Sequence, residues 1–162
     1  MLFLHLKVAD APIDFGVRAY QHDKARSLRR ALDAVTSPQR ANFIVAGDFN
    51  PVGLELTFSP RDIDPAEEIA RLRAMYGFHR DRMRLVPKSH AVTFWNGPGA
   101  SDPPVDLDHV VAADHVSFGA DANGAEIRVR GWPELASDTE QGDWIRDYSD
   151  HACQLFEVAG TP

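Results

Sequence analysis

The sequence has little cysteine, no excess of positive charge and no long apolar run. Its single cysteine, Cys153, excludes an internal disulfide and a cysteine-rich zinc site, and we expect it in a strand as a small core residue. The 24 acidic residues outnumber the 17 basic ones and give a formal net charge of −7, which disfavours sequence-independent binding to long nucleic acid. Residues 1–8 are apolar but few, and His5 and Lys7 interrupt them, so we predict no transmembrane segment or secretory signal.

The composition that remains is ordinary for one folded domain. The chain has 162 residues, of which 44% are apolar and 25% charged, as in soluble globular proteins. We therefore expect residues 1–162 to form a single domain, and the single cysteine favours a cytoplasmic location.

The apolar pattern predicts an α/β (α+β) fold. Residues 1–8 and 43–45 are typical of strands, and between them residues 18–35 fit an amphipathic helix with an apolar face and a solvated basic face, which gives a strand–helix–strand unit. The apolar face is predicted to consist of Ala25, Leu28, Leu32 and Val35. A second helix is predicted from the capping residue Asp64 to about Tyr76. The later chain is predicted to be β-rich, with strands at 91–95, 107–112, 116–118, 126–130 and 152–158.

Polar residues follow directly after the strand that contains residues 43–45. Asp48 and Asn50, in Ala-Gly-Asp-Phe-Asn-Pro-Val, lie where a strand ends, and open α/β sheets keep their ligand crevices at such ends. Asp48 can orient a water or hold a cation, and Asn50 can donate a hydrogen bond to an oxyanion, so the pair suits attack on a phosphate ester. A simple Asx-turn is the structural alternative.

Two further groups of polar residues stand at strand entrances. Asp106, Asp108 and His109 precede an apolar run, and strand alternation places the two acids on one face and His109 on the other. His151, in Ser-Asp-His before the last predicted strand, can act as a base or contact a phosphate if a carboxylate such as Asp108 fixes its tautomer. Taken singly, each of these residues could equally be a polar loop residue.

Four motifs taken in order resemble the later motifs of the endonuclease/exonuclease/phosphatase family. They are His-Leu-Lys at 5–7, Gly-Asp-Phe-Asn at 47–50, Leu-Asp-His-Val at 107–110 and Ser-Asp-His at 149–151. This family includes DNase I-like nucleases, abasic-site endonucleases, sphingomyelinases and inositol polyphosphate 5-phosphatases. The resemblance implies a DNase I-like two-sheet β-sandwich flanked by helices, and a divalent-metal-dependent phosphoesterase that hydrolyses its substrate with an activated water.

The resemblance also implies roles for single residues. Asp48 matches the family's water-orienting Asp, Asn50 its phosphate-binding neighbour, and His151 the histidine that contacts the phosphate or acts as base. Asp108 matches the Asp that hydrogen-bonds this histidine, and Asp150 an acid near the divalent cation, Mg²⁺ or Mn²⁺. His5 matches the histidine that assists the leaving group, with a buried strand histidine as the alternative. Trp95 is interpreted either as a wall of the substrate cleft or as packing.

The chain departs from the family at its start. Family members carry an Asn and a metal-binding Glu well upstream of the histidine strand, but only four residues precede His5, and none is Asn or Glu. The chain therefore resembles the C-terminal part of the domain without its N-terminal strands, as a fragment, a mis-assigned start or a degenerate relative. We expect uncovered apolar sheet surface and unpaired sheet edges, and weak or absent hydrolysis because Asp150 alone is a poor Mg²⁺ site.

Two other functions fit parts of the pattern. One is a non-catalytic binding module that keeps the fold, with a second copy or another partner over the exposed sheet. The other is a calcineurin-like metallophosphatase, but the sequence has neither the early Asp-x-His nor the later Gly-Asn-His that this class needs. The substrate is left open between a small molecule, a lipid headgroup and nucleic acid.

Overall fold

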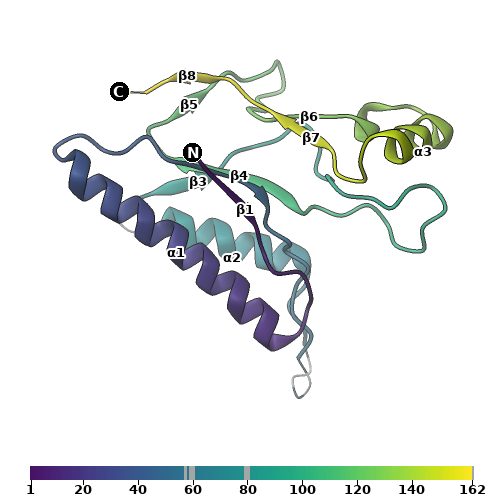
Figure 1. Ribbon diagram of the computed structural model, residues 1–162, viewed down its shortest axis with the longest axis horizontal. Coiled ribbons are helices and arrows are strands. Elements are labelled where there is room, and N and C mark those ends of the chain that lie inside the picture. The colour runs from purple at the N-terminus through teal and green to yellow at the C-terminus, as the bar shows by residue number, and fades with distance from the viewer. Residues whose placement is uncertain (57, 59–60, 79–80, 162) are drawn as a thin grey trace.

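The computed structural model describes residues 1–56, 58, 61–78 and 81–161. The described residues form a mixed α/β fold, in agreement with the predicted class, with three α-helices and strands in one four-stranded and two two-stranded sheets. The larger sheet lies between two helices on one side and two β-ribbons on the other (Figure 1).

The four-stranded sheet has the order β1-β2-β4-β3. Strand β1 (Leu2–His5) runs parallel to β2 (Ile44–Asp48), whereas β4 (Asp108–Ala113) is antiparallel to both β2 and β3 (Met83–Leu85). All six residues of β4 are buried, as expected for an apolar strand with layers on both faces. The predicted strand–helix–strand unit is therefore present, with the helix as the crossover between β1 and β2.

Helix α1 (Pro12–Thr36) differs from the prediction in its start and in its buried face. It begins earlier because Pro12 suits the first turn of a helix. Leu28 and Val35, predicted to be core residues, are exposed. The helix buries three arginines together with a histidine and an alanine: Arg18, His22, Ala25, Arg26 and Arg29. The prediction of a solvated basic face is confirmed for Lys24 and Arg30, which are exposed, and is wrong for Arg26 and Arg29, which are buried.

Helix α2 (Pro65–Gly77) confirms the second predicted helix. The Asp64 carboxylate accepts a hydrogen bond from the Glu67 backbone N–H and caps the first turn. Leu72 and Tyr76 are buried against the sheet together with Val45 and Val111. The two helices thus close one face of the sheet with an apolar core.

The later part of the chain is less regular than predicted. Strand β5 (Ser117–Phe118) pairs with β8 (Val158–Gly160), and β6 (Arg128–Arg130) pairs with β7 (Cys153–Leu155). The strand predicted at 91–95 is wrong, since only Phe94 makes isolated bridges there, to Val105 and His151. Cys153 lies in a strand as predicted, but it is exposed rather than in the core.

Two elements between the predicted strands were missed. A 3₁₀ turn (Trp132–Glu134) precedes helix α3 (Asp138–Asp147), which begins with a capping box between Ser137 and Glu140. Strand β3 was also missed, because its basic residues favour a solvated loop. Among the helices of the described residues, none has the length and apolar character needed to span a bilayer.

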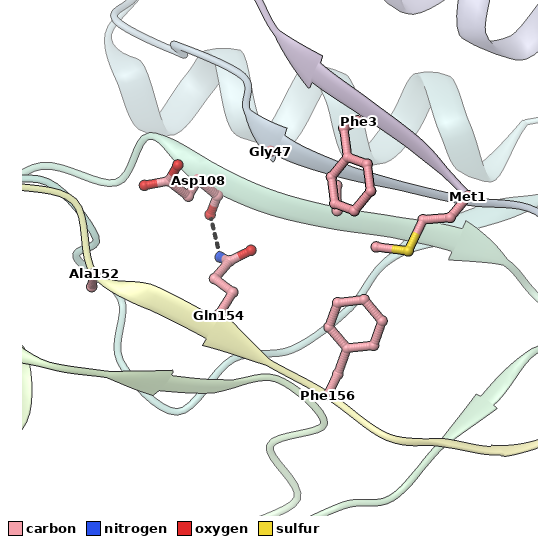
Figure 2. A pocket seen from close by; sticks show the side chains of 8 residues that line it. Met1, Phe3, Gly47, Asp108, Ala152, Gln154 and Phe156 are labelled. Carbon is pink, nitrogen blue, oxygen red and sulfur yellow. Dashed lines mark hydrogen bonds between the residues drawn. The ribbon is translucent and has the colours of Figure 1, made fainter.

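Apolar side chains are exposed at the free edge of β1, which pairs only with β2 among the described strands. Phe3 is 73% exposed and Met1 59%. With Phe156 they surround a cavity of about 320 Å³ between the large sheet and β7 (Figure 2). The uncovered apolar surface and the unpaired edge are those that the sequence predicted.

Candidate active site

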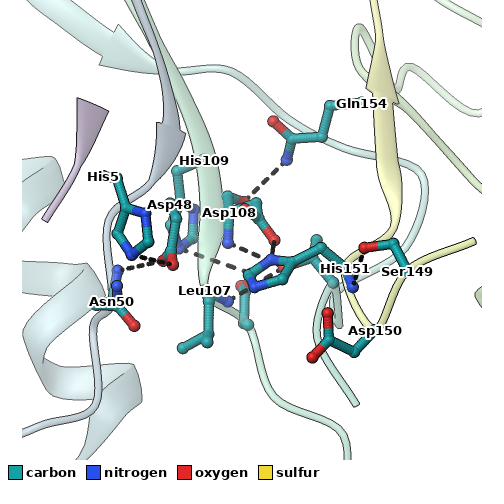
Figure 3. Close-up of polar contacts among 12 residues, drawn as sticks. His5, Asp48, Asn50, Leu107, Asp108, His109, Ser149, Asp150, His151 and Gln154 are labelled. Atoms are coloured by element: carbon teal, nitrogen blue, oxygen red, sulfur yellow. Dashed lines mark hydrogen bonds and ion pairs between the residues drawn. The ribbon is translucent and has the colours of Figure 1, made fainter. Parts of the chain in front are cut away.

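Three of the predicted site residues lie side by side on neighbouring strands. The strand register pairs His5 with Asp48, and Asp48 with Asp108. His5 and Asp48 end their parallel strands, whereas Asp108 begins an antiparallel one. All three side chains therefore lie at the same end of the sheet, where these strands end or begin (Figure 3). Residues distant in sequence are thus brought together by backbone pairing.

Gly47 allows the close pairing that places His5 beside Asp48. Its φ is +136°, and a Cβ at this position would lie 2.0 Å from the Leu4 carbonyl oxygen. Any larger residue would force β1 away from β2 just before the two site residues. The close approach of the Leu4 carbonyl therefore explains why the first residue of the Gly-Asp-x-Asn motif is glycine.

Asp48 makes a turn and also faces the site. Its Oδ1 accepts a hydrogen bond from the Asn50 backbone N–H at 2.9 Å, so the predicted Asx-turn is present. Its Oδ2 lies 3.6 Å from His5 Nε2, and the His5 side chain is 81% exposed rather than buried. Burial raises the pKa of the Asp48 carboxyl, and the Asp108 charge raises it further against the opposing effect of the Asn50 N–H and the two histidines.

Asn50 ties the two strand ends together. It adopts a left-handed backbone with a φ of 47°, and its side-chain amide donates to the Leu6 carbonyl at 3.0 Å. The side chain also borders the cleft described below. Its amide group can donate two hydrogen bonds, so one remains for a ligand.

His151 is oriented by Asp108, as predicted. Its Nδ1 lies 2.9 Å from Asp108 Oδ2, which makes Nδ1–H the donor and leaves Nε2 as the second reactive nitrogen. The hydrogen bond to Asp108 raises the pKa of His151; burial opposes this, and the charges of Asp108, Asp48 and Asp150 support it. The site thus holds an imidazole that is readily protonated.

Three side chains outside the four motifs hold the backbone of Asp108. Thr93 Oγ1 accepts from the backbone N–H groups of Leu107 at 3.1 Å and Asp108 at 2.9 Å. Lys88 Nζ and Gln154 Nε2 donate to the Asp108 carbonyl at 2.7 and 2.9 Å. The sequence does not predict these contacts, because each side chain reaches Asp108 only through the tertiary fold.

Asp106 does not share a face with Asp108, contrary to the alternation argument. Its carboxylate pairs with Lys88 and lies 3.6 Å from His109 Nε2, on the opposite side of the sheet from His151. The alternation fails because β4 begins at Asp108, so Asp106 lies outside the regular strand. His109 is buried, and this burial lowers its pKa to about 3, so it stays neutral inside the core.

A cleft of about 390 Å³ opens at the end of the sheet that carries His5, Asp48 and Asp108. The site residues His5, Asp48, Asn50 and His151 border it, and its other lining residues are Val8, Val52, Phe94, Asn96, Asp102, Pro103, Val105 and Leu107. Among the described residues that line the cleft there is no Lys and no Arg, and Trp95 is not one of them. Trp95 packs on Trp132 with ring centroids 5.6 Å apart, which favours packing over a role in the cleft. The aromatic wall is Phe94, whose ring centroid lies 4.9 Å from that of His151.

Asp150 follows Ser149 at the rim of the site (Figure 3). Its backbone carbonyl accepts from Trp95 N–H and Trp132 Nε1, while its carboxylate forms no hydrogen bond or ion pair with any described residue. Within the described part of the chain, no three His, Cys, Asp or Glu side chains are grouped so as to hold a metal ion. The residues present therefore do not complete a divalent-metal site around Asp150.

No protein-family model matches this chain, and no curated protein matches it. The family resemblance of the four motifs therefore stays a prediction.

Proposed function

We propose that this chain is a divalent-metal-dependent phosphoesterase of the endonuclease/exonuclease/phosphatase type, built on part of a DNase I-like sandwich. The observation that supports it is the register of His5, Asp48 and Asp108 across three neighbouring strands, with His151 hydrogen-bonded to Asp108. The arrangement combines a carboxylate, a protonatable imidazole held by a second carboxylate, and a further histidine around one cleft.

Each side chain has a place in phosphate ester hydrolysis. Asp48 orients the attacking water and accepts its proton through Oδ2, the oxygen that the Asx-turn does not use and that faces His5. Protonated His151 donates to a non-bridging phosphate oxygen and stabilises the charge that develops there. His5, within 3.6 Å of Asp48, supplies a proton to the leaving oxygen from the exposed side of the cleft.

Mg²⁺ or Mn²⁺ is the proposed cofactor, and Asp150 is its candidate ligand. Because the described residues do not group into a three-ligand site, the ion has no defined part in the steps given above. We therefore expect hydrolysis by this chain to be slow. A Mg²⁺ ion held by one carboxylate keeps most of its water ligands and binds weakly.

The cleft favours a small substrate with one phosphate group. Its wall is mainly apolar, and Asp102 contributes a negative charge. The lining and the net charge of −7 together disfavour a long polyanion such as DNA. We propose a small phosphodiester with an apolar substituent, acted on in the cytoplasm.

Hydrolysis of bis(4-nitrophenyl) phosphate tests the proposal. Wild-type protein should show slow turnover that needs Mg²⁺ or Mn²⁺ and stops with EDTA. Asp48→Asn and His151→Ala should reduce this turnover by about 100-fold. Asp143→Asn, in the exposed helix α3, is the matched control and should leave it unchanged. Turnover that survives both site substitutions would contradict the proposed roles.

A non-catalytic binding module is the second candidate. It is favoured by the free β1 edge and by the exposure of Phe3 and Met1, which suit a partner better than solvent. Calorimetric titration with Mn²⁺ separates the two functions. A binding module should give neither saturable heat nor hydrolysis, whereas the phosphoesterase should give weak saturable binding of Mn²⁺ and slow hydrolysis.

A further inference from the structure

Arg18 and Glu68 form a buried ion pair between helices α1 and α2. Arg18 Nε lies 2.8 Å from Glu68 Oε1, and Arg18 Nη2 lies 2.9 Å from Glu68 Oε2, so the contact is bidentate. Arg18 is 0% exposed and Glu68 4%. Such a pair is costly to desolvate, and it persists only when its remaining hydrogen-bonding groups are also satisfied.

The guanidinium of Arg18 uses all of its N–H donors. Nη1 donates to the backbone carbonyls of Lys7, at 3.3 Å, and of Ala9, while Nη2 donates to the Gly53 carbonyl at 2.7 Å. Glu68 Oε2 also accepts from the Gly53 backbone N–H at 2.7 Å. A lysine, with a single ammonium group, cannot reproduce this fork of contacts.

The two segments held by this pair leave the strand ends that carry the site. Residues 6–10 follow His5, and residues 49–53 follow Asp48. The segments are joined by hydrogen bonds from Leu6 N–H to the Asp48 carbonyl at 2.9 Å and from the Asn50 side chain to the Leu6 carbonyl. The ion pair therefore holds both the segment that follows His5 and the segment that follows Asp48.

We propose that Arg18 and Glu68 are positioning residues that fix His5 relative to Asp48 and Asn50. This inference rests on the proposed function only in treating these three as reacting groups. Neither Arg18 nor Glu68 borders the cleft, so neither is a catalytic residue.

Backbone strain in the two segments explains why such a device is needed. Ala9 has a φ of 126°, which is unfavourable for a residue with a Cβ, and Asn50 has a φ of 47°, in the left-handed region that asparagine tolerates better than most residues. Without external hydrogen bonds these segments would relax to commoner conformations. An apolar pair could stabilise the interface between the helices equally well, but it could not hold carbonyl groups in place.

Arg29 offers a matched control on the same helix. It is 0% exposed, like Arg18, but it pairs with Asp33 of its own helix at 2.9 Å. No hydrogen bond from Arg29 to residues 6–10 or 49–53 is present in the described structure. Arg29→Met therefore removes a buried arginine without touching the site segments.

Amide hydrogen exchange of the folded chain, without metal or substrate, tests the inference. The quantity measured is the ratio of the exchange rates of the Leu6 and Val52 amides to that of Val111 in the core. This ratio should rise by at least about tenfold in Arg18→Met. It should rise equally in Arg18→Met/Glu68→Leu, which removes both charges. In Arg29→Met this ratio should stay at the wild-type value. Arg18→Lys should not restore protection.

A ratio that is unchanged in the folded Arg18 variants would overturn the inference. If both apolar variants unfold, the same exchange ratio is measured in Glu68→Gln, which keeps the side-chain shape and one acceptor oxygen. An unchanged ratio in that variant would then overturn the inference. Since exchange requires no turnover, a failure here is distinct from a failure of the proposed phosphoesterase activity.

Discussion

His151 Nδ1 lies 2.9 Å from Asp108 Oδ2, although the two residues are 43 positions apart in the sequence. The contact joins the beginning of β4 to His151, two residues before β7, so it links the large sheet to the β-ribbon. It fixes the imidazole tautomer and raises the pKa of His151. The proposed chemistry depends on this contact more than on any other.

Asp108→Asn should lower the pKa of His151. The substitution removes the carboxylate that raises this pKa and leaves the opposing effect of burial. NMR titration of the His151 ring protons measures the change directly, and the His115 ring, which contacts Asn42 at the other end of β2, is the internal control. An unchanged His151 midpoint would show that Asp108 does not hold the charge.

The same pair gives a pH-dependent stability. Because the folded-state pKa of His151 is raised above its ordinary value of 6.5, the pair stabilises the protein fully below pH 6.5 and loses this effect as pH rises through the folded-state pKa. Urea unfolding should therefore show a larger loss for Asp108→Asn at about pH 5.5 than at about pH 8.5.

Asp48→Asn should stabilise the protein at neutral pH while reducing its turnover by about 100-fold. The raised pKa of Asp48 means that its ionised form is disfavoured in the folded state. This cost appears as pH rises above 3.8, the ordinary value, and is complete above the folded-state pKa. The free energy of unfolding of the variant should exceed that of wild type at pH 7 and match it near pH 3. Equal stability at both pH values would contradict the raised pKa.

Gly47→Ala should destabilise the fold by more than about 3 kcal/mol, because its Cβ would collide with the Leu4 carbonyl at the β1–β2 pair. Gly16→Ala makes the same change at an exposed position within α1, where the added Cβ would meet no neighbouring atom within 4 Å. That control should stabilise by about 0.5–1 kcal/mol. Urea unfolding measures both, and similar effects at the two positions would rule out the steric explanation.

Thr93→Val should cost about 2–4 kcal/mol, since it leaves the buried N–H groups of Leu107 and Asp108 without their acceptor. The control is Thr36→Val, at an exposed hydroxyl near the end of α1, and it should change the free energy of unfolding by about 0.5 kcal/mol or less. A Thr93→Val protein as stable as wild type would show that the two N–H groups find other partners.

The sequence predicted the parts of the site that strand pairing alone brings together. Gly-Asp-x-Asn after an apolar run placed Asp48 at a strand end, and the residue types suggested that Asp108 would hold His151. Helix α2 was predicted because its cap, first-turn proline and terminal glycine are local signals. In these cases local patterns and tertiary structure agree.

Interactions that depend on distant partners could not be predicted from such patterns. Arg18 and Arg29 are charged and lie in a helix, so periodicity alone assigns them to solvent, yet both are buried. Nothing near Arg18 in the sequence indicates Glu68, which is 50 positions away. Asp106 was placed on the wrong face because the regular strand begins only at Asp108.

Titration with inorganic phosphate, followed by NMR of the histidine rings, tests the central claim most directly. With Mg²⁺ present, phosphate should shift the ring signals of His5 and His151 in a saturable way and leave His115 unchanged. Asp108→Asn should weaken this binding by about tenfold, because it removes the partner that raises the pKa of His151 and orients its ring. If the His5 and His151 signals do not respond, or respond no more than His115, the cleft is not a phosphate site and the proposed phosphoesterase function is wrong.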